Sequence, residues 1–256
     1  MGSALAGAMV RKGLLRAEEL LFLEPSDERA EAFRREIGAR RAKDPADLAA
    51  HSRVLFLAVK PQHLPGLLAE LKPHLGPQTL LVSIAAGVSI QKIQALLAPA
   101  ANPVARAMPN TPARVGAGVS AIAFSANVAA ADRERVGALF AAAGRSLVVD
   151  EKLMNAVTAV SGSGPAYVFL FIEALADAGV RQGLPRDIAQ TLALETVRGA
   201  AELVRDSGLH PAVLKDQVTS PGGTTIAALE ALEAGGLRSA LFRAVAAATK
   251  RAEELG

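Results

Sequence analysis

The sequence has no cysteine, no tryptophan and a single tyrosine in 256 residues. Without cysteine there can be no disulfides, no thiolate nucleophile and no cysteine-ligated metal. The four histidines, at positions 51, 63, 74 and 210, form neither an HxH nor an HxxxH pair. The sequence therefore predicts no metal site.

Long uncharged runs are also missing. The most apolar stretch, residues 167–176, contains Glu173 and is followed by Asp177, so it falls short of the roughly 18 apolar residues that a membrane span needs. No secretory signal pattern opens the sequence. The net charge is only +3 and basic residues alternate with acidic ones, which is typical of solvated helix faces. We expect a soluble, cytoplasmic protein with no membrane or nucleic-acid partner.

What the sequence does contain, over residues 1–150, is an alternation of short apolar runs with amphipathic segments. Such alternation predicts βαβ units and a mainly parallel sheet. The expected strands are residues 20–23, 54–59, 79–84, 104–108, 119–124 and 146–149. The expected helices are residues 27–37 (capped by Ser26), 61–71, a segment from 89, and 130–142.

Residues 151–256 show no convincing strand. Helices are expected at residues 151–160, 164–182, 185–206, 210–217 and 223–255, the last with a break at its two glycines. We expect the hydroxyls and amides of residues 161–165 to cap the second of these helices. That helix is apolar nearly all round and must be buried, so a partner subunit is expected to cover it. A compact monomeric bundle is the alternative.

Residues 1–10 form a helix of small residues with no strand before it. This is typical of the first helix of a dinucleotide-binding unit, in which the third glycine of G-x-G-x-x-G opens the helix. Here that glycine would be Gly2. The first strand and its two glycines would precede Met1, so about ten residues are expected to be missing, through a misplaced start codon or a deliberate truncation. The strand at 20–23 leads to Glu24, where an acid would bind the adenosine ribose.

Candidate ligand loops follow the strands at 54, 79 and 104, at the sheet edge where ligands usually bind. They are residues 58–61, 85–87 and 108–112. Each is also typical of an ordinary turn, and Lys60 could simply face solvent. Residues 219–225 (TSPGGTT) combine hydroxyls, glycines and free amides before a helix, which suits a carboxylate. A plain N-cap is the alternative.

Four runs occur in the order and spacing found in pyrroline-5-carboxylate reductases. They are LFLAVKP at 55–61, MPNTP at 108–112, VSGSGPAY at 160–167 and LKDQVTSPGGTT at 214–225. The whole chain resembles this family. The resemblance implies a Rossmann-like domain over residues 1–150 and an all-α domain over residues 151–256 that dimerises and binds substrate. It also implies a homodimer, in many members assembled into a ring of dimers.

The same resemblance implies the activity, the reduction of 1-pyrroline-5-carboxylate to proline with NADPH or NADH, and the site residues. The cofactor residues would be Gly2, Glu24, Ala58, Val59, Lys60, Pro61, Ala85, Ala86, Gly87, Met108 and Asn110. Those that bind the imino-acid substrate, across the dimer interface, would be Ser220, Gly222, Gly223, Thr224 and Thr225. The predicted catalytic role of Thr225 is a hydrogen bond to the ring nitrogen, with Lys60 a weaker candidate for proton supply.

The chain departs from the family pattern in three places. The first strand and its glycines are absent, and Pro45 stands where many members have an asparagine that contacts the adenosine. Glu24 occupies the place where a 2′-phosphate would have to be tolerated. A carboxylate repels a 2′-phosphate, so NADH should be used at least as well as NADPH. One alternative function is a non-catalytic truncated paralogue that keeps the helical dimer. Another is a 3-hydroxyacid or imine dehydrogenase, which would be expected to carry a catalytic lysine on the helix at 164–182. That segment has none.

Overall fold

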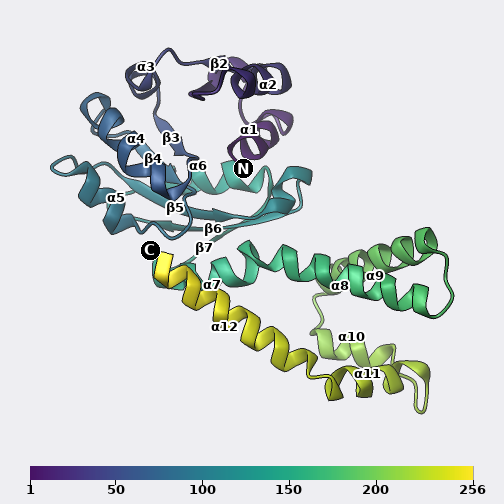
Figure 1. Cartoon of the computed structure of the whole chain (residues 1–256). Coiled ribbons are helices and arrows are strands. Elements are labelled where there is room, and N and C mark those ends of the chain that lie inside the picture. Colours follow the sequence, from purple (N-terminus) through teal and green to yellow (C-terminus); the bar gives the residue numbers. More distant parts are fainter. Residues whose placement is uncertain (256) are drawn as a thin grey trace. The chain divides into compact units, whose positions relative to one another are not determined.

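The computed structural model describes residues 1–255 and divides into two compact units (Figure 1). The first contains Met1–Ser163 together with residues from Ala247 onward, and the second contains Gly164–Ala246. The first unit is α/β and the second is entirely helical.

The main sheet of the first unit has five strands. In spatial order they are β3 (Val54–Leu57), β4 (Leu80–Ser83), β5 (Val104–Pro109), β6 (Gly118–Phe124) and β7 (Gly144–Val148). All neighbouring pairs are parallel except β5 with β6. Only a short turn around Thr111–Val115 joins those two strands. A parallel pair needs a much longer crossover, so the chain returns antiparallel.

Two further strands form a separate small sheet. β1 (Leu21–Phe22) pairs in parallel with β2 (Arg40–Arg41). Among the described residues no ladder joins this pair to β3.

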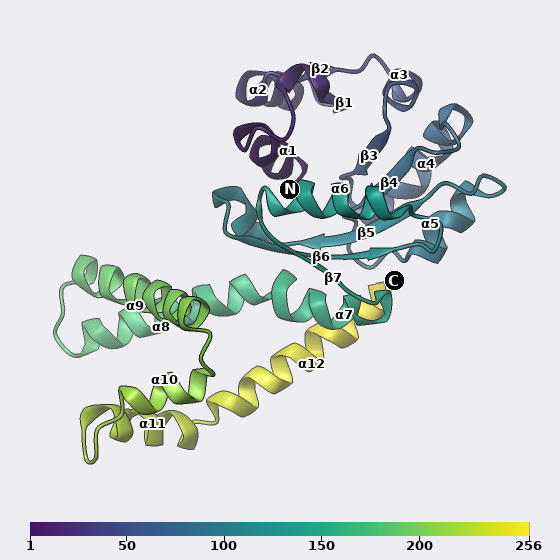
Figure 2. The same ribbon diagram turned by 180° about the vertical axis from the view of Figure 1, so that it is seen from behind.

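Helices cover both faces of the main sheet (Figures 1 and 2). One face packs against α3 (Pro45–Ala50), α4 (Leu64–Leu71), α5 (Ile90–Leu97) and α7 (Met154–Val157). The other packs against α1 (Gly2–Arg11) and α6 (Ala130–Ala141). Strand residues alternate between the two cores, as the two-residue period requires: Leu55 and Leu57 face the first, and Val54 and Phe56 the second.

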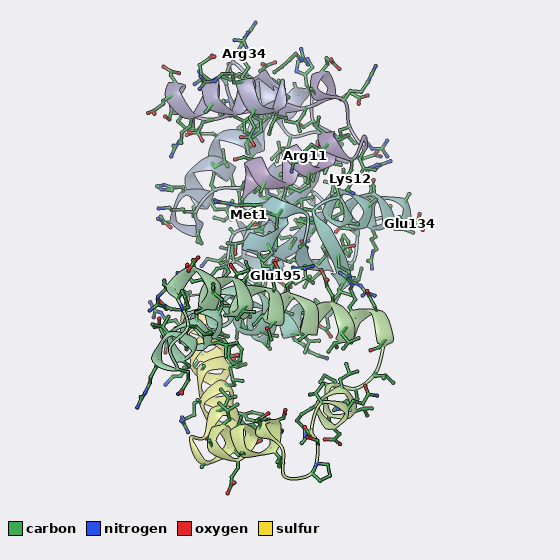
Figure 3. All side chains as sticks on the ribbon, turned by 90° about the vertical axis from the view of Figure 1, so that its right-hand side faces the viewer. Met1, Arg11, Lys12, Arg34, Glu134 and Glu195 are labelled. Atoms are coloured by element: carbon green, nitrogen blue, oxygen red, sulfur yellow. The ribbon has the colours of Figure 1, made fainter. Side chains whose placement is uncertain are left out.

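Both ends of α2 (Asp27–Ile37) are set by neighbouring residues in the sequence. The Ser26 hydroxyl accepts from the Arg29 amide at 3.4 Å, and Gly38, with φ of +80°, ends the helix. This helix and its cap are confirmed. Charged side chains lie on its outer face, where Arg34 projects away from the unit (Figure 3). Sequence analysis missed β2, because two exposed arginines carry no strand signal, and α3, which is short.

At the start of β6 and β7 the two backbones approach so closely that only glycine fits. A Cβ placed on Gly144 would lie 1.9 Å from the Gly118 carbonyl oxygen. Gly144 also has a φ of +145°, which L side chains rarely adopt. Gly118 and Gly144 lie opposite each other at the start of this parallel pair.

A single helix, Glu151–Arg181, leads from the sheet into the second unit and includes α7 and α8 (Gly164–Arg181). The expected cap at residues 161–165 is wrong. The Ser161 hydroxyl donates to the Val157 carbonyl at 3.0 Å, inside a π-helical turn over Thr158–Gly162. The chain therefore continues as helix through these residues, and no new helix start is capped there.

By length and composition this helix could cross a membrane, which is weak evidence because core helices of soluble proteins pass the same test. Its first third is part of the sheet unit's core: Met154 and Ala159 are fully buried.

The second unit is built on the antiparallel pair α8 and α9 (Arg186–Ser207), in contact through Ala176, Ala189 and Ala193 (Figure 1). It continues with α10 (Pro211–Gln217), α11 (Thr224–Ala234) and most of α12 (Leu237–Leu255). Much of α8 is uncovered in the single chain, with Phe169 61% and Leu170 65% exposed. Exposed apolar area of this kind marks an interaction surface.

Candidate functional site

The three loops predicted to bind ligand lie at one edge of the main sheet. β3, β4 and β5 are parallel neighbours, with Leu57 opposite Ser83 and Ser83 opposite Arg106. Their carboxyl ends therefore share an edge, which carries the loops 58–61, 84–89 and 110–115. The structure brings together the candidate residues of these loops.

The first helix begins beside the end of β3. A Cβ on Gly2 would lie 3.0 Å from the Ala58 Cβ, tighter than ordinary contact. No side chain caps this helix start. Free amides at a helix N-terminus suit a phosphate, and glycine permits the close approach.

Small residues continue the edge. Ala58 and Ala86 are exposed, Ala85 is buried, and Gly87 turns the chain with φ of +77°. Lys60 is exposed, whereas Val59 packs partly into the core beside the loop. An open edge of small residues next to an uncapped helix fits the diphosphate and the flat ring of a nicotinamide dinucleotide.

Glu24 follows β1 and is held by its neighbours. Its Oε1 accepts from the Ser26 amide at 3.0 Å and from the Arg29 Nη2 at 2.8 Å. The guanidinium of Arg41 donates both to the Glu24 carbonyl oxygen and to the Asp27 carboxylate. The acid predicted to bind the ribose is therefore paired with Arg29. Sequence analysis did not predict this pairing.

Met108 lies at the end of β5, and Asn110 directly follows the strand. A Cβ on Gly162 would lie 2.5 Å from the Met108 Cε, so the π-turn of the long helix packs against this strand end. Asn110 is buried, and its Oδ1 accepts from the Val119 amide at 2.9 Å. That bond closes the turn between β5 and β6. The predicted cofactor contact of Asn110 stays a prediction.

A carboxylate that sequence analysis did not single out also reaches this region. Glu151 Oε1 accepts from the Ile90 amide at 2.7 Å and lies 3.2 Å from Nη1 of the buried Arg106. The three residues are far apart in the sequence; the one available signal was an arginine inside an apolar strand. The neighbouring Asp150 is exposed, and Lys152 holds the pKa of its carboxyl below the ordinary value.

The candidate substrate loop, 219–225, lies in the second unit. Gly222 has φ of +64°, and the Gly223 amide donates to the Ser220 carbonyl at 3.1 Å. A Cβ on Gly223 would lie 2.2 Å from the Ser220 hydroxyl, so a larger residue there would displace that side chain. α11 then begins at Thr224 with no side-chain cap.

The start of α11 therefore leaves amides free to bind an anion. Thr224 is exposed and Thr225 half-buried, both in its first turn. No group of three or more histidine or acidic side chains that could hold a metal occurs among residues 1–255.

The dinucleotide edge of the sheet, followed by a helical unit with an open anion-binding helix start, defines a class: two-domain nicotinamide-dependent oxidoreductases. Family models agree with both parts. Residues 151–255 match pyrroline-5-carboxylate reductase dimerisation, and residues 1–87 match NADP oxidoreductase coenzyme F420-dependent.

Curated relatives match the entire chain. A pyrroline-5-carboxylate reductase from Synechocystis sp. is 48% identical over 256 residues, which are 100% of this chain and 95% of that protein. The protein of that name from Escherichia coli is 38% identical over 100% of this chain and 94% of its own length. The Plasmodium falciparum pyrroline carboxylate reductase, solved with NADP bound, is 35% identical with a TM-score of 0.90, over 100% of this chain and 94% of that one. The chain belongs to the pyrroline-5-carboxylate reductase family.

Proposed function

We propose that the chain reduces 1-pyrroline-5-carboxylate to proline, the last step of proline biosynthesis, with NADH or NADPH. The observation that carries this most directly is 48% identity over the whole chain to a pyrroline-5-carboxylate reductase, with every ligand loop present. The bound cofactor supplies a hydride to the imine carbon, and the ring nitrogen ends with a proton.

The sheet edge is proposed to hold the cofactor. The amides that begin α1 at Gly2 face the diphosphate, and the small residues Ala58, Ala85 and Ala86 admit the flat ring. Exposure of Ala58 and Ala86 beside the uncapped helix start supports this assignment. Met108 lies near the carboxyl end of β5, the strand next to β4.

The start of α11 is proposed to hold the substrate carboxylate. Its free amides and the hydroxyls of Ser220 and Thr224 can donate to the carboxylate oxygens. Gly222 and Gly223 shape the turn that exposes these donors. Catalysis then consists mainly of positioning a bound imine against the hydride donor.

Thr225 is proposed to hydrogen-bond the ring nitrogen. Its half-buried hydroxyl lies in the first turn of α11, one residue from the carboxylate donors. An imine that arrives protonated requires no strong acid from the protein, which fits a loop of hydroxyls and amides. Lys60, exposed at the cofactor edge, is the second candidate for the proton.

For the cofactor preference we propose that NADH is used at least as well as NADPH. The Glu24 carboxylate uses Oε1 for its bonds to Ser26 and Arg29, so Oε2 can accept from a ribose hydroxyl. Arg29 offsets part of the charge, so the repulsion of a 2′-phosphate is weaker than that of an unpaired acid.

The chain carries its family's dimerisation region. We further propose a homodimer, assembled into a ring of dimers, in the cytoplasm, with no membrane or nucleic-acid partner. The exposed Phe169 and Leu170 of α8 support subunit contact, because a partner helix would bury them. Burial in this way would also account for the apolar composition of the helix Glu151–Arg181.

The test is the reaction itself. The purified chain is mixed with the cyclic imine and NADH or NADPH, and both cofactor oxidation and proline are measured. Stoichiometric proline formation supports the proposal. If neither cofactor is oxidised while the chain remains folded and dimeric, the non-catalytic alternative is correct.

A further inference from the structure

A buried arginine lies at the centre of the main sheet. Arg106 is on β5, between Val104 and Met108 of the first core, and its side chain is 9% exposed. A buried guanidinium is costly unless it is paired. Its hydrogen-bond partner is Glu151, 45 residues away in the sequence.

The same carboxylate oxygen has a second donor. The Ile90 amide, at the start of α5, lies 2.7 Å from Glu151 Oε1. Ile90 directly follows the loop 84–89, which begins with a bond from the Ala85 amide to the Ser83 hydroxyl at 3.3 Å. One end of that loop is therefore fixed by its own strand and the other by Glu151.

Glu151 is also the first residue of the long helix Glu151–Arg181. Farther along this helix, Gly162 packs on Met108 of the same strand β5. The helix is thus held to β5 at two points, Glu151 and Gly162, and the first of them is the carboxylate that anchors the loop 84–89.

We infer that Glu151, paired with Arg106, is a positioning residue that sets the shape of the loop 84–89 against the nicotinamide ring. The inference rests on the proposed function, which assigns Ala85–Gly87 to the cofactor. Without the carboxylate, the end of the loop loses its acceptor and Arg106 loses its partner. The loop then no longer presents its small residues at the distance that a flat ring requires.

The test compares three variants of the full chain. Glu151→Ala removes both bonds, whereas Glu151→Gln keeps an acceptor oxygen for Ile90 and Arg106 without the charge. Asp150→Asn is the matched control, because it removes an exposed charge paired with Lys152 and keeps an oxygen for the Lys152 amide that Asp150 caps. Kinetic constants for both substrates, the melting temperature and amide hydrogen exchange of the free protein are measured for each.

For Glu151→Ala we expect KM for NADH to rise about tenfold, as the loss of a charge-assisted bond implies, and kcat to fall. KM for the imine should stay within about twofold, since none of its proposed binding residues belongs to the loop 84–89, and Asp150→Asn should behave as wild type. Glu151→Gln should recover most of the loss. In the free Glu151→Ala protein, amides of residues 85–90 should exchange about tenfold faster.

Two results overturn the inference. One is a lower melting temperature in Glu151→Ala with unchanged KM, kcat and local exchange, which is a purely structural role. The other is an equal rise in both KM values. If the wild-type chain oxidises neither cofactor, the proposed function fails, and the exchange of residues 85–90 still decides whether Glu151 shapes the loop.

Discussion

Replacing Glu24 by glutamine should shift the cofactor preference toward NADPH. Glu24 follows β1, at the place where an acid would bind the ribose, and its carboxylate meets the Arg29 guanidinium at 2.8 Å. A 2′-phosphate placed near this pair would be repelled by the Glu24 carboxylate and attracted by the Arg29 guanidinium. Removing the carboxylate leaves Arg29 free to attract the phosphate.

The size of the change in cofactor preference depends on how far solvent screens the Glu24 and Arg29 side chains. Two unit charges 4 Å apart interact by about 1 kcal/mol in water and about 4 kcal/mol near a protein surface. The Glu24 side chain is 29% exposed and Arg29 is 71% exposed, so the lower part of that range applies. We expect the ratio of kcat/KM for NADPH to that for NADH to rise about tenfold in Glu24→Gln.

Removing the positive charge instead of the negative one gives a second test of the same placement. Arg29→Gln should lower the same ratio about tenfold, because the carboxylate then acts alone on the phosphate. Initial rates with both cofactors are measured at low and high salt, and both shifts should shrink at high salt. Glu28→Gln, which removes a neighbouring acid at the start of α2, is the control. Equal shifts in Glu24→Gln and Glu28→Gln, or no shift in either, would refute the placement of Glu24 at the ribose.

Four further outcomes are expected. Thr225→Ala should lower kcat/KM about tenfold, the value of one hydrogen bond, with recovery in Thr225→Ser; wild-type kinetics in the alanine variant would remove its catalytic role. Gly144→Ala should destabilise the protein by about 2 to 4 kcal/mol in urea titration, since its Cβ meets the Gly118 carbonyl, whereas Gly137→Ala, open inside α6, should be neutral or stabilising. Phe169→Asp should yield monomers in sedimentation if α8 forms the subunit contact. Lys60→Met should keep the wild-type kcat if the imine arrives protonated, and a large loss would make Lys60 the proton source.

Much of the first unit follows from local patterns in the sequence. The apolar run at 54–59 predicts β3, and Ser26 predicts the start of α2, because strand period, helix period and N-caps each depend on a few neighbouring residues. β2 and α3 escaped this reasoning. Two exposed arginines are held as a strand only because β1 lies beside them.

In the candidate site, too, local sequence patterns indicate some features and give no sign of others. The loops at 58–61, 85–87 and 219–225 were found from small residues and glycines at the ends of expected elements. The partners that hold these loops were not found. Ile90 and Glu151 are 61 residues apart, and nothing local in either segment indicates the other.

By itself, the sequence determined the order of strands and helices apart from β2 and α3, the start of α2 at Ser26, and the loops with ligand chemistry, because these depend on residues close together in the chain. Only the tertiary structure decided the antiparallel return of β6, the passage of one unbroken helix through the π-turn over Gly162, and the pairing of Arg106 with Glu151. The physical reason is that a buried charge needs a partner, and a close backbone contact needs a neighbour of the right size. Both are supplied by residues that folding brings together. Those neighbours come from distant segments, where local periodicity carries no information.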